Sequence, residues 1–466
     1  MRFHWIARRV CLAPILFGVM GGFGVWGEVS AAAEPRLVVE RTTLENGLEV
    51  LLHEDHRTPI VTVNVWYHVG SKDEAPGKNG FAHLFEHMMF QGSKHVPEDA
   101  YFRTLERVGA TDINGSTNTD RTNYFETVPR RELELALWLE SDRMAFLLDH
   151  VDEHSYAGQR DVVKNERRQN YENAPYGMVG QFVRAHLFPK EHPYHLLTIG
   201  TPKDLDQATL DDVKSFFRTF YVPKNATLVV CGDIDKVKTK ELVDKYFGPI
   251  RGGLAPARKI VPETRLSGVT RLEVSAGVEL PRVYVSWTTP AFFAPGDADL
   301  DVVARVMTHG KTSRLFKRLV YDLQIAQDVS AHQASMQVGS VFEIVATAQP
   351  GHTAEDLVKV IDEEIKKLQD GGVSDAEVLR AKTSIRASAV FDLERVATRA
   401  DRLNSYNHYT GDPNYLTKDL ERNERVSPGS VKDAVVRFLP IERRVVVLVT
   451  PNPNAPIAGK LEKVQR

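Results

Sequence analysis

The segment from His83 to His87, with the sequence His-Leu-Phe-Glu-His, constrains this 466-residue chain more than any other. Residues four apart in an α-helix lie about 40° apart around its axis, so both imidazoles can face one metal ion. Glu86 projects beside the same point. Two neutral nitrogen ligands with an adjacent carboxylate base suit zinc-dependent hydrolysis of an amide. The segment therefore predicts a metal-binding helix that carries a catalytic base.

The flanks of this segment, residues 80–82 and 88–92, are apolar and contain glycine at both ends. This pattern is typical of a buried helix that ends at a glycine. Two histidines and a glutamate are costly to bury unless something binds them, which favours the metal site. The alternative is a structural helix that matches the pattern by chance.

Residues 1–33 are predicted to be a signal peptide. Arg2, Arg8 and Arg9 form a positive region, residues 10–25 are mostly apolar and small, and three alanines end the segment at Ala33. These are the marks of a cleaved export signal, so we expect an exported protein without stable membrane insertion after cleavage. Arg8-Arg9 leaves the twin-arginine route open beside the general secretory route, and an uncleaved membrane anchor is the alternative.

Cleavage would remove one of the two cysteines and leave Cys231 alone. No intramolecular disulfide is then possible, so stability must come from a large hydrophobic core. Cys231 ends the apolar run 226–231, which predicts a strand with a buried thiol rather than a nucleophile. The net charge of −3 gives no indication of nucleic-acid or membrane binding, and we expect no nucleic-acid partner.

A third metal ligand must come from elsewhere in the chain, because two histidines cannot complete a protein zinc site. A helix is expected over residues 154–171, and Glu166 is its best-placed acidic residue. Periodicity alone does not separate Glu166 from Glu172, or from a solvated charge on the same helix.

The pattern of His83 to His87 followed by Glu166 in Val-Val-Lys-Asn-Glu-Arg-Arg resembles the pitrilysin/insulinase family of zinc peptidases. The likeness is closest to short, bacterial, processing-peptidase-like members, and it extends to residues 114–124, 192–201 and 221–233. It implies that His83, His87 and Glu166 bind one Zn²⁺ per chain and that Glu86 activates water. In a bacterium the export signal would place the protein in the periplasm.

The stretch Asn114, Gly115, Ser116 and Thr117 resembles the family's substrate-side strand. The resemblance implies that it binds a peptide substrate as an added strand through backbone contacts. Such pairing requires extended peptides or unfolded segments. One departure is Gln159, where many members have a glutamate two helical turns before the ligand glutamate. Gln159 carries no charge, so it would tune the metal site less without abolishing its function.

The predicted fold class is α+β, with two structurally homologous domains, each a mixed sheet backed by helices. The domains are residues 34–250, which carry the metal site, and 269–466, joined by the Gly/Pro-rich linker 251–268. Residues 283–287 repeat the pattern of the strand at 60–67, and 296–310 repeat that of the motif helix. The resemblance implies that the two domains form half of a clamshell.

The second copy is expected to lack the metal site. Setting Gly310 against Gly92 places Asp301, Ala304 and Arg305 opposite His83, Glu86 and His87. Further helices are expected over residues 98–108, 131–150, 354–369 and 375–404, and a final strand over 445–450.

The second domain also departs from self-sufficient relatives, which carry an arginine and, seven residues later, a tyrosine near the substrate. Aligned over residues 313–327, these positions fall on Val320 and Gln327. The resemblance therefore implies a heterodimer with a zinc-less homologous chain that supplies the Arg/Tyr pair. A homodimer, a monomer, or use of Arg314 and Tyr321 are the alternatives. For the function itself, the alternative is a non-catalytic peptide-binding or structural subunit.

Overall fold

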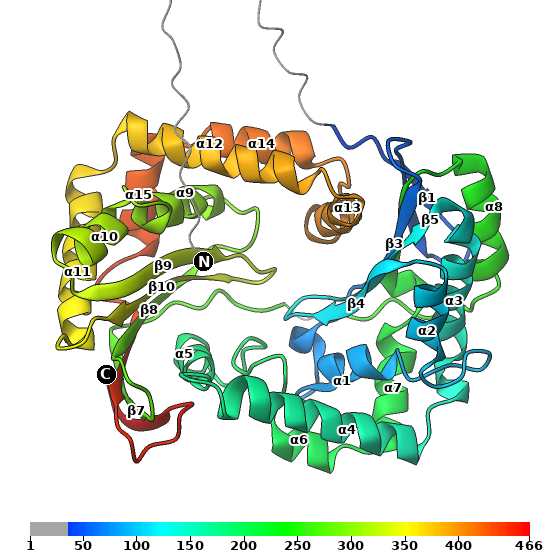
Figure 1. Cartoon of the computed structure of the whole chain (residues 1–466), viewed down its shortest axis with the longest axis horizontal. Coiled ribbons are helices and arrows are strands. Elements are labelled where there is room, and N and C mark those ends of the chain that lie inside the picture. The colour runs from blue at the N-terminus through cyan, green and yellow to red at the C-terminus, as the bar shows by residue number, and fades with distance from the viewer. Residues whose placement is uncertain (1–35, 259) are drawn as a thin grey trace, which may run out of the picture. The chain divides into compact units, whose positions relative to one another are not determined.

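The computed structural model describes residues 36–258 and 260–466. In that part of the chain the first sheet has six strands in the order β1-β2-β6-β3-β5-β4. Figure 1 labels β1, β3, β4 and β5 of this sheet. β2 and β6 run parallel, and the other neighbours are antiparallel. The strands are β1 Glu40–Thr43, β2 Glu49–Glu54, β3 Ile60–Tyr67, β4 Thr111–Thr117, β5 Thr122–Pro129 and β6 Ala226–Gly232.

The second sheet repeats this arrangement in the order β12-β7-β11-β8-β10-β9. β7 and β11 form its parallel pair, as β2 and β6 do in the first sheet. The outer strand beside the parallel pair comes from opposite ends of the described chain, β1 in one sheet and β12 in the other. The predicted α+β fold with two homologous mixed sheets is confirmed. The strands are β7 Thr270–Ala276, β8 Arg282–Thr289, β9 Ala326–Ala334, β10 Ser340–Ala348, β11 Val445–Pro451 and β12 Lys460–Gln465.

Helices pack on the first sheet and enclose a large apolar core. α1 contacts β4, β5, α4 and α7, and α3 contacts β3 and β5. α4 continues into a wider helical turn at Arg168–Glu172. The helices of this half are α1 Phe81–Met88, α2 Ala100–Arg107, α3 Leu133–Phe146, α4 Glu153–Arg167, α5 Val179–Leu187, α6 Pro202–Gln207, α7 Leu210–Phe220 and α8 Lys236–Phe247.

A second core lies between the second sheet and its helices. α11 contacts β8, β10 and β11, and α9 contacts β9 and α15. The helices of this half are α9 Asp297–Thr308, α10 Arg314–Phe316, α11 Ala354–Gly371, α12 Asp375–Asp392, α13 Val396–Thr410, α14 Leu416–Glu424 and α15 Pro428–Phe438.

The helix predicted over residues 375–404 is two helices, because the chain is extended at Arg395 (φ −83°, ψ 132°). After this break α13 packs on β3 and β6 of the first sheet, where Ala400 and Leu403 share a core with Leu51 and Val229. Burial of this apolar face outweighs local helix continuity. Since α5 likewise contacts β11 of the second sheet, packing crosses the predicted linker. The domain boundaries stay a prediction.

Two further sequence-based expectations are wrong in detail. The strand at 445–450 is not the last one, because the largely exposed β12 follows it. The predicted alignment of the two motif helices is shifted by two residues. Both α1 and α9 begin after a glycine with positive φ, Gly80 at 98° and Gly296 at 99°. Alignment at these glycines places Asp299, Val302 and Val303 opposite the three motif residues, so this register also provides no pair of histidines.

Cys231 lies in β6 and is fully buried, as predicted. The predicted signal peptide, residues 1–33, lies outside the described residues. Within the described ranges, no helix is both long and apolar enough to cross a membrane.

Removing the apolar contact of α13 should destabilise the protein. Leu403→Ala leaves a cavity against the first sheet and should lower the free energy of unfolding by about 2–5 kcal/mol. Leu379→Ala on α12 is the matched control, because Leu379 is 66% exposed and should change it by less than about 0.5 kcal/mol. Urea unfolding measures both variants. Equal midpoints for the two would contradict the packing of α13 on this sheet.

Candidate metal centre

Helix α1 has one apolar face and one polar face. Phe81, Leu84, Phe85 and Met88 are buried in the first core. The Phe85 ring stacks on that of Phe216 with a centroid distance of 5.3 Å. Because this face is fixed by packing, the other face of α1 is left to present the two histidines and Glu86.

The start of α1 is held by backbone contacts. The Glu74 carboxylate accepts hydrogen bonds from the N–H groups of Gly80 (3.1 Å) and Ala82 (2.9 Å). These are N–H groups that a helix terminus cannot satisfy internally. Gly80 has positive φ, and a Cβ there would lie 2.9 Å from the Ile199 carbonyl oxygen. Glycine is therefore required at this turn, and the position of the histidines depends on it.

Glu166 on α4 lies beside both imidazoles. Its Oε2 is 3.3 Å from Nε2 of His87 and 3.6 Å from Nε2 of His83. The three potential ligand atoms lie within 4.8 Å of one another. Ligands about 2.0–2.1 Å from a tetrahedral zinc ion are roughly 3.3 Å apart. Two imidazole nitrogens and one carboxylate oxygen at these separations fit Zn²⁺ with one position left for water or substrate.

The protonation state of His83 suits a ligand. Burial lowers the pKa of His83 to about 4, with a further contribution from His87, so its imidazole is neutral at neutral pH. Its Nδ1 is buried and has no hydrogen-bond partner among the described residues. On the other side of the site, Asn170 donates to Oε1 of Glu166 (3.3 Å), while Oε2 is the oxygen nearest both imidazoles.

Glu86 lies between the histidines and strand β4. Burial raises the pKa of its carboxyl, and the nearby Thr117 hydroxyl opposes this shift. A Cβ at Gly115 would lie 3.0 Å from Cγ of Glu86 and 3.2 Å from the Tyr124 ring. The missing side chain at Gly115 thus lets β4 approach Glu86 closely. A carboxyl with a raised pKa is a suitable proton acceptor near neutral pH.

The predicted substrate residues Asn114 to Thr117 lie on the outer strand of the first sheet. β4 pairs with β5 on one side, and no strand among the described residues pairs with its other edge. The Gly115 N–H donates to its neighbour Asn114 (Oδ1, 2.8 Å), and Arg121 donates to the Ser116 carbonyl oxygen (2.8 Å). The strand is in a suitable place for an added peptide, and this role stays a prediction.

The structure distinguishes Glu166 from Glu172, the two glutamates between which periodicity alone did not decide. Glu172 lies in the helical turn after α4 and pairs with Nε of Arg167 at 2.9 Å. Glu166 is the one that approaches both histidines. Sequence reasoning missed Glu74, because the polar loop 71–79 gives no signal for a buried carboxylate that holds a helix.

The arginine and tyrosine considered in the second half do not form a free pair. Arg314 is paired with Glu377 (2.6 Å) and donates to the Gly372 carbonyl oxygen (3.1 Å). Tyr321 is 47% exposed. Val320 packs against the second core, and Gln327 is exposed on β9. A guanidinium that is already paired is poorly suited to bind substrate.

The fold and the site define a duplicated α+β protein in which one half presents a candidate metal centre. A model of the insulinase family (peptidase family M16) matches residues 49–197, and one described as the peptidase M16 inactive domain matches residues 207–385. The zinc protease PqqE of Helicobacter pylori is 33% identical over 361 residues, which cover 76% of this chain and 80% of that protein.

Two solved structures share the fold. A protease from Helicobacter pylori matches with a TM-score of 0.83 and 29% identity, over 89% of this chain and 100% of that one. The periplasmic protease PqqL from Escherichia coli matches with a TM-score of 0.75 and 18% identity, over 90% of this chain and 48% of that one. The chain belongs to the insulinase family of peptidases, which confirms the predicted resemblance. The name of the Helicobacter pylori relative, a zinc protease, implies zinc as the metal.

Removal of the candidate carboxylate ligand, Glu166, should reduce metal binding if the assignment is correct. Glu166→Ala leaves only the two histidines, so zinc occupancy after dialysis should fall well below one ion per chain. Glu172→Ala is the matched control on the same helical segment and should keep its zinc. Elemental analysis of both purified variants decides the assignment, and equal occupancy in the two would show that Glu166 is not a ligand.

Proposed function

We propose that this chain is a zinc-dependent metalloendopeptidase that hydrolyses extended peptides or unfolded segments. The observation that carries the proposal is the approach of Glu166 to both imidazoles beside the partly buried carboxyl of Glu86. A metal-binding set, a base and an open strand edge lie within one small region of the first half. Membership of a peptidase family supports the same reaction class.

His83, His87 and Glu166 would hold the zinc ion. When bound, zinc would polarise the scissile carbonyl and lower the pKa of water in the site. Glu86 would accept the proton that the attacking water loses, and would return it to the leaving amine.

Strand β4 would hold the substrate. A peptide added at its free edge would pair through backbone groups, so affinity would depend little on the substrate sequence. The close contact of Gly115 with Glu86 would bring the peptide backbone next to the base. This requirement for an extended backbone excludes folded proteins as direct substrates.

The alternative is a non-catalytic peptide-binding or structural subunit of the same fold. The family model described as inactive covers residues 207–385, which lie outside the histidine motif and Glu166. A chain without catalysis has no need of the complete donor set and an adjacent base. Elemental analysis together with cleavage of a quenched fluorescent peptide distinguishes the two functions.

We further propose that the protein is exported and acts in the periplasm. The support is the positively charged and then apolar sequence of residues 1–33. The structural neighbour from Escherichia coli is described as a periplasmic protease, which agrees with this location.

Glu86→Gln should abolish most of the activity without loss of metal. The three ligands remain, so zinc content should be unchanged, whereas turnover should fall at least about 10²-fold because the base is lost. Hydrolysis of a quenched peptide and elemental analysis measure both quantities. Glu106→Gln on α2 is an exposed control that should behave as wild type. Wild-type turnover in Glu86→Gln would remove Glu86 from the mechanism.

The second half gives a reason to expect a partner chain. Val320 cannot donate a side-chain hydrogen bond, and Gln327 has neither charge nor ring, so contacts that stabilise the transition state would be missing. Arg314 is already paired with Glu377. We propose a heterodimer in which a homologous chain without the histidine motif supplies the arginine and tyrosine.

Co-expression with homologous chains that lack the motif tests this pairing. The purified chain alone should cleave a quenched peptide slowly, and the correct companion should raise turnover and form a complex of about twice the mass by light scattering. A homologous chain with its arginine and tyrosine replaced by alanine is the control, and it should bind without raising turnover. Full activity of the isolated chain, unchanged by any companion, would rule the heterodimer out.

A further inference from the structure

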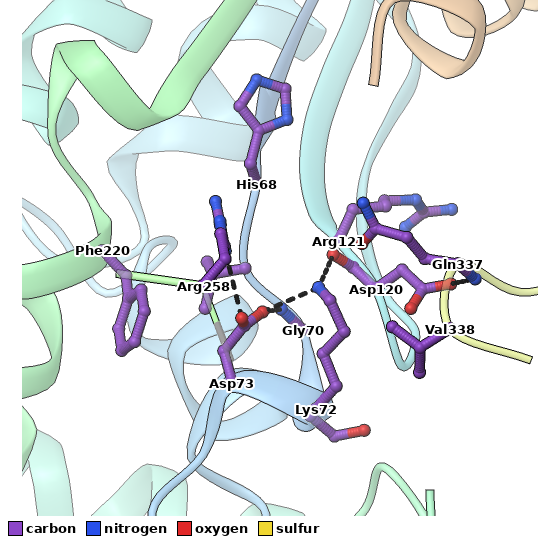
Figure 2. Close-up of polar contacts among 12 residues, drawn as sticks. His68, Gly70, Lys72, Asp73, Asp120, Arg121, Phe220, Arg258, Gln337 and Val338 are labelled. Atoms are coloured by element: carbon purple, nitrogen blue, oxygen red, sulfur yellow. Dashed lines mark hydrogen bonds and ion pairs between the residues drawn. The ribbon is translucent and has the colours of Figure 1, made fainter. Parts of the chain in front are cut away.

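A buried aspartate lies in the turn that ends the candidate substrate strand. Asp120, in the turn between β4 and β5, is 1% exposed. Its carboxylate accepts hydrogen bonds from the Tyr194 hydroxyl (2.5 Å), the Gln337 N–H (3.0 Å) and the Tyr409 hydroxyl (3.3 Å). Figure 2 shows Asp120 directed at the segment of Gln337 and Val338. A buried carboxylate is costly unless such partners are present.

Tyr194 connects the same two segments. Its hydroxyl donates to Asp120 and accepts from the Val338 N–H at 3.1 Å. Burial raises the pKa of Tyr194, so the hydroxyl remains protonated and can donate. Gln337 and Val338 lie in the turn between β9 and β10. Asp120 and Tyr194 therefore join the β4–β5 turn of the first sheet to the β9–β10 turn of the second.

The β4–β5 turn is also fixed to the first half. The N–H of Lys72 donates to the Thr119 carbonyl oxygen (3.0 Å), and its ammonium donates to the Asp120 carbonyl oxygen (2.8 Å) (Figure 2). The Lys72 side chain is only 9% exposed and pairs with Asp73. Arg258 also contacts Asp73, at 3.0 Å. The turn cannot move without breaking several buried polar contacts.

The position of the turn is transmitted to β4. Arg121, next to Asp120, donates to the carbonyl oxygen of Ser116 at 2.8 Å and to its hydroxyl at 2.5 Å. Ser116 adjoins Gly115, which packs against Glu86. Because β5 holds the paired residues of β4, a displacement of Asp120 would move the turn end of β4 more than the rest of the edge to which the substrate is proposed to pair.

We propose that Asp120 is a positioning residue that, through Tyr194, aligns β4 with the β9–β10 turn so that a long extended peptide contacts both halves at once. The inference rests on the proposed peptidase function and adds a substrate class to it. The seven residues of β4 span roughly 23 Å at about 3.3 Å per residue. Peptides of more than about ten residues would extend past the strand towards the joined turns, whereas peptides of about five would not.

Asparagine at position 120 would disrupt this junction without removing its volume. The amide has one acceptor oxygen, and its NH₂ group must face either the Gln337 N–H or the Tyr194 hydroxyl. A donor would then oppose the Gln337 N–H, or the Tyr194 hydroxyl would lose its acceptor. Tyr194→Phe breaks the same junction from the other side. Tyr406→Phe is the matched control, because it removes a similar buried Tyr–Asp bond, to Asp419 at 2.8 Å, that joins α13 to α14.

Peptide binding can be measured without turnover in the zinc-loaded Glu86→Gln chain. Fluorescence anisotropy with labelled peptides of about five and about twenty residues, sharing one core sequence, gives Kd for each variant. Asp120→Asn and Tyr194→Phe should each weaken binding of the long peptide about tenfold, the factor that 1.4 kcal/mol represents, and leave the short peptide within about twofold. The double variant should be no weaker than either single one, because both act through one contact.

A merely structural role predicts a different pattern. Loss of folded protein would weaken the binding of both peptides equally. It would also appear as a lower zinc content or a lower unfolding midpoint. Equal effects on the two peptides, no effect on the long one, or the same length dependence in Tyr406→Phe would overturn the proposal. Hydrolysis by the chain with Glu86 intact is measured separately, alone and with its companion chain. No hydrolysis in either form, together with length-dependent binding, would refute the peptidase function and leave the positioning role of Asp120 standing.

Discussion

The site depends on the burial of one face of α1. Phe85 and its apolar neighbours are fixed in an aromatic core, so the helix cannot rotate, and the motif residues are confined to the opposite face. Burial lowers the pKa of the candidate ligand His83 and raises that of Glu86, since both effects come from loss of water. The burial of α1 therefore sets both the direction of the two histidines and the pKa values of His83 and Glu86. A looser helix would lose ligand geometry and base strength together.

A buried ion pair between Arg143 and Glu140 lies beside Tyr124, which is hydrogen-bonded to α1. Arg143 on α3 pairs with Glu140, and its guanidinium lies over the Tyr124 ring at 4.4 Å. Tyr124 in turn donates to the Phe85 carbonyl oxygen (3.2 Å) and contacts Gly115. Burial raises the pKa of the neighbouring Glu126 well above its usual value, and the nearby Glu140 adds to this shift. The contacts of Arg143 and Tyr124 thus link α3 to both the metal-bearing helix and the strand edge.

Much of this arrangement could be predicted from the sequence, because it has strong local signals. The alternation in β3 and the motif in α1 gave those elements with nearly correct bounds. Periodicity did not decide between Glu166 and Glu172, and the choice of Glu166 came from the family resemblance; the three-dimensional path of α4 brings Glu166 to both histidines and Glu172 to Arg167. The break before α13 and the two-residue shift of α9 were missed for a related reason. Both are decided by packing against distant strands and by loop length, which periodicity does not encode.

The two halves share a topology but differ in the polar side chains that their equivalent helices, α1 and α9, carry. In the second half, the fully buried Asp297 at the start of α9 is satisfied internally by Arg422 (2.7 Å) and Ser335 (2.6 Å). In the first half, His83 and Glu166 approach each other with two imidazoles and one carboxylate converging on a single point. The second copy keeps the sheet, and its β9–β10 turn contacts the β4–β5 turn, which follows the strand that lies beside Glu86.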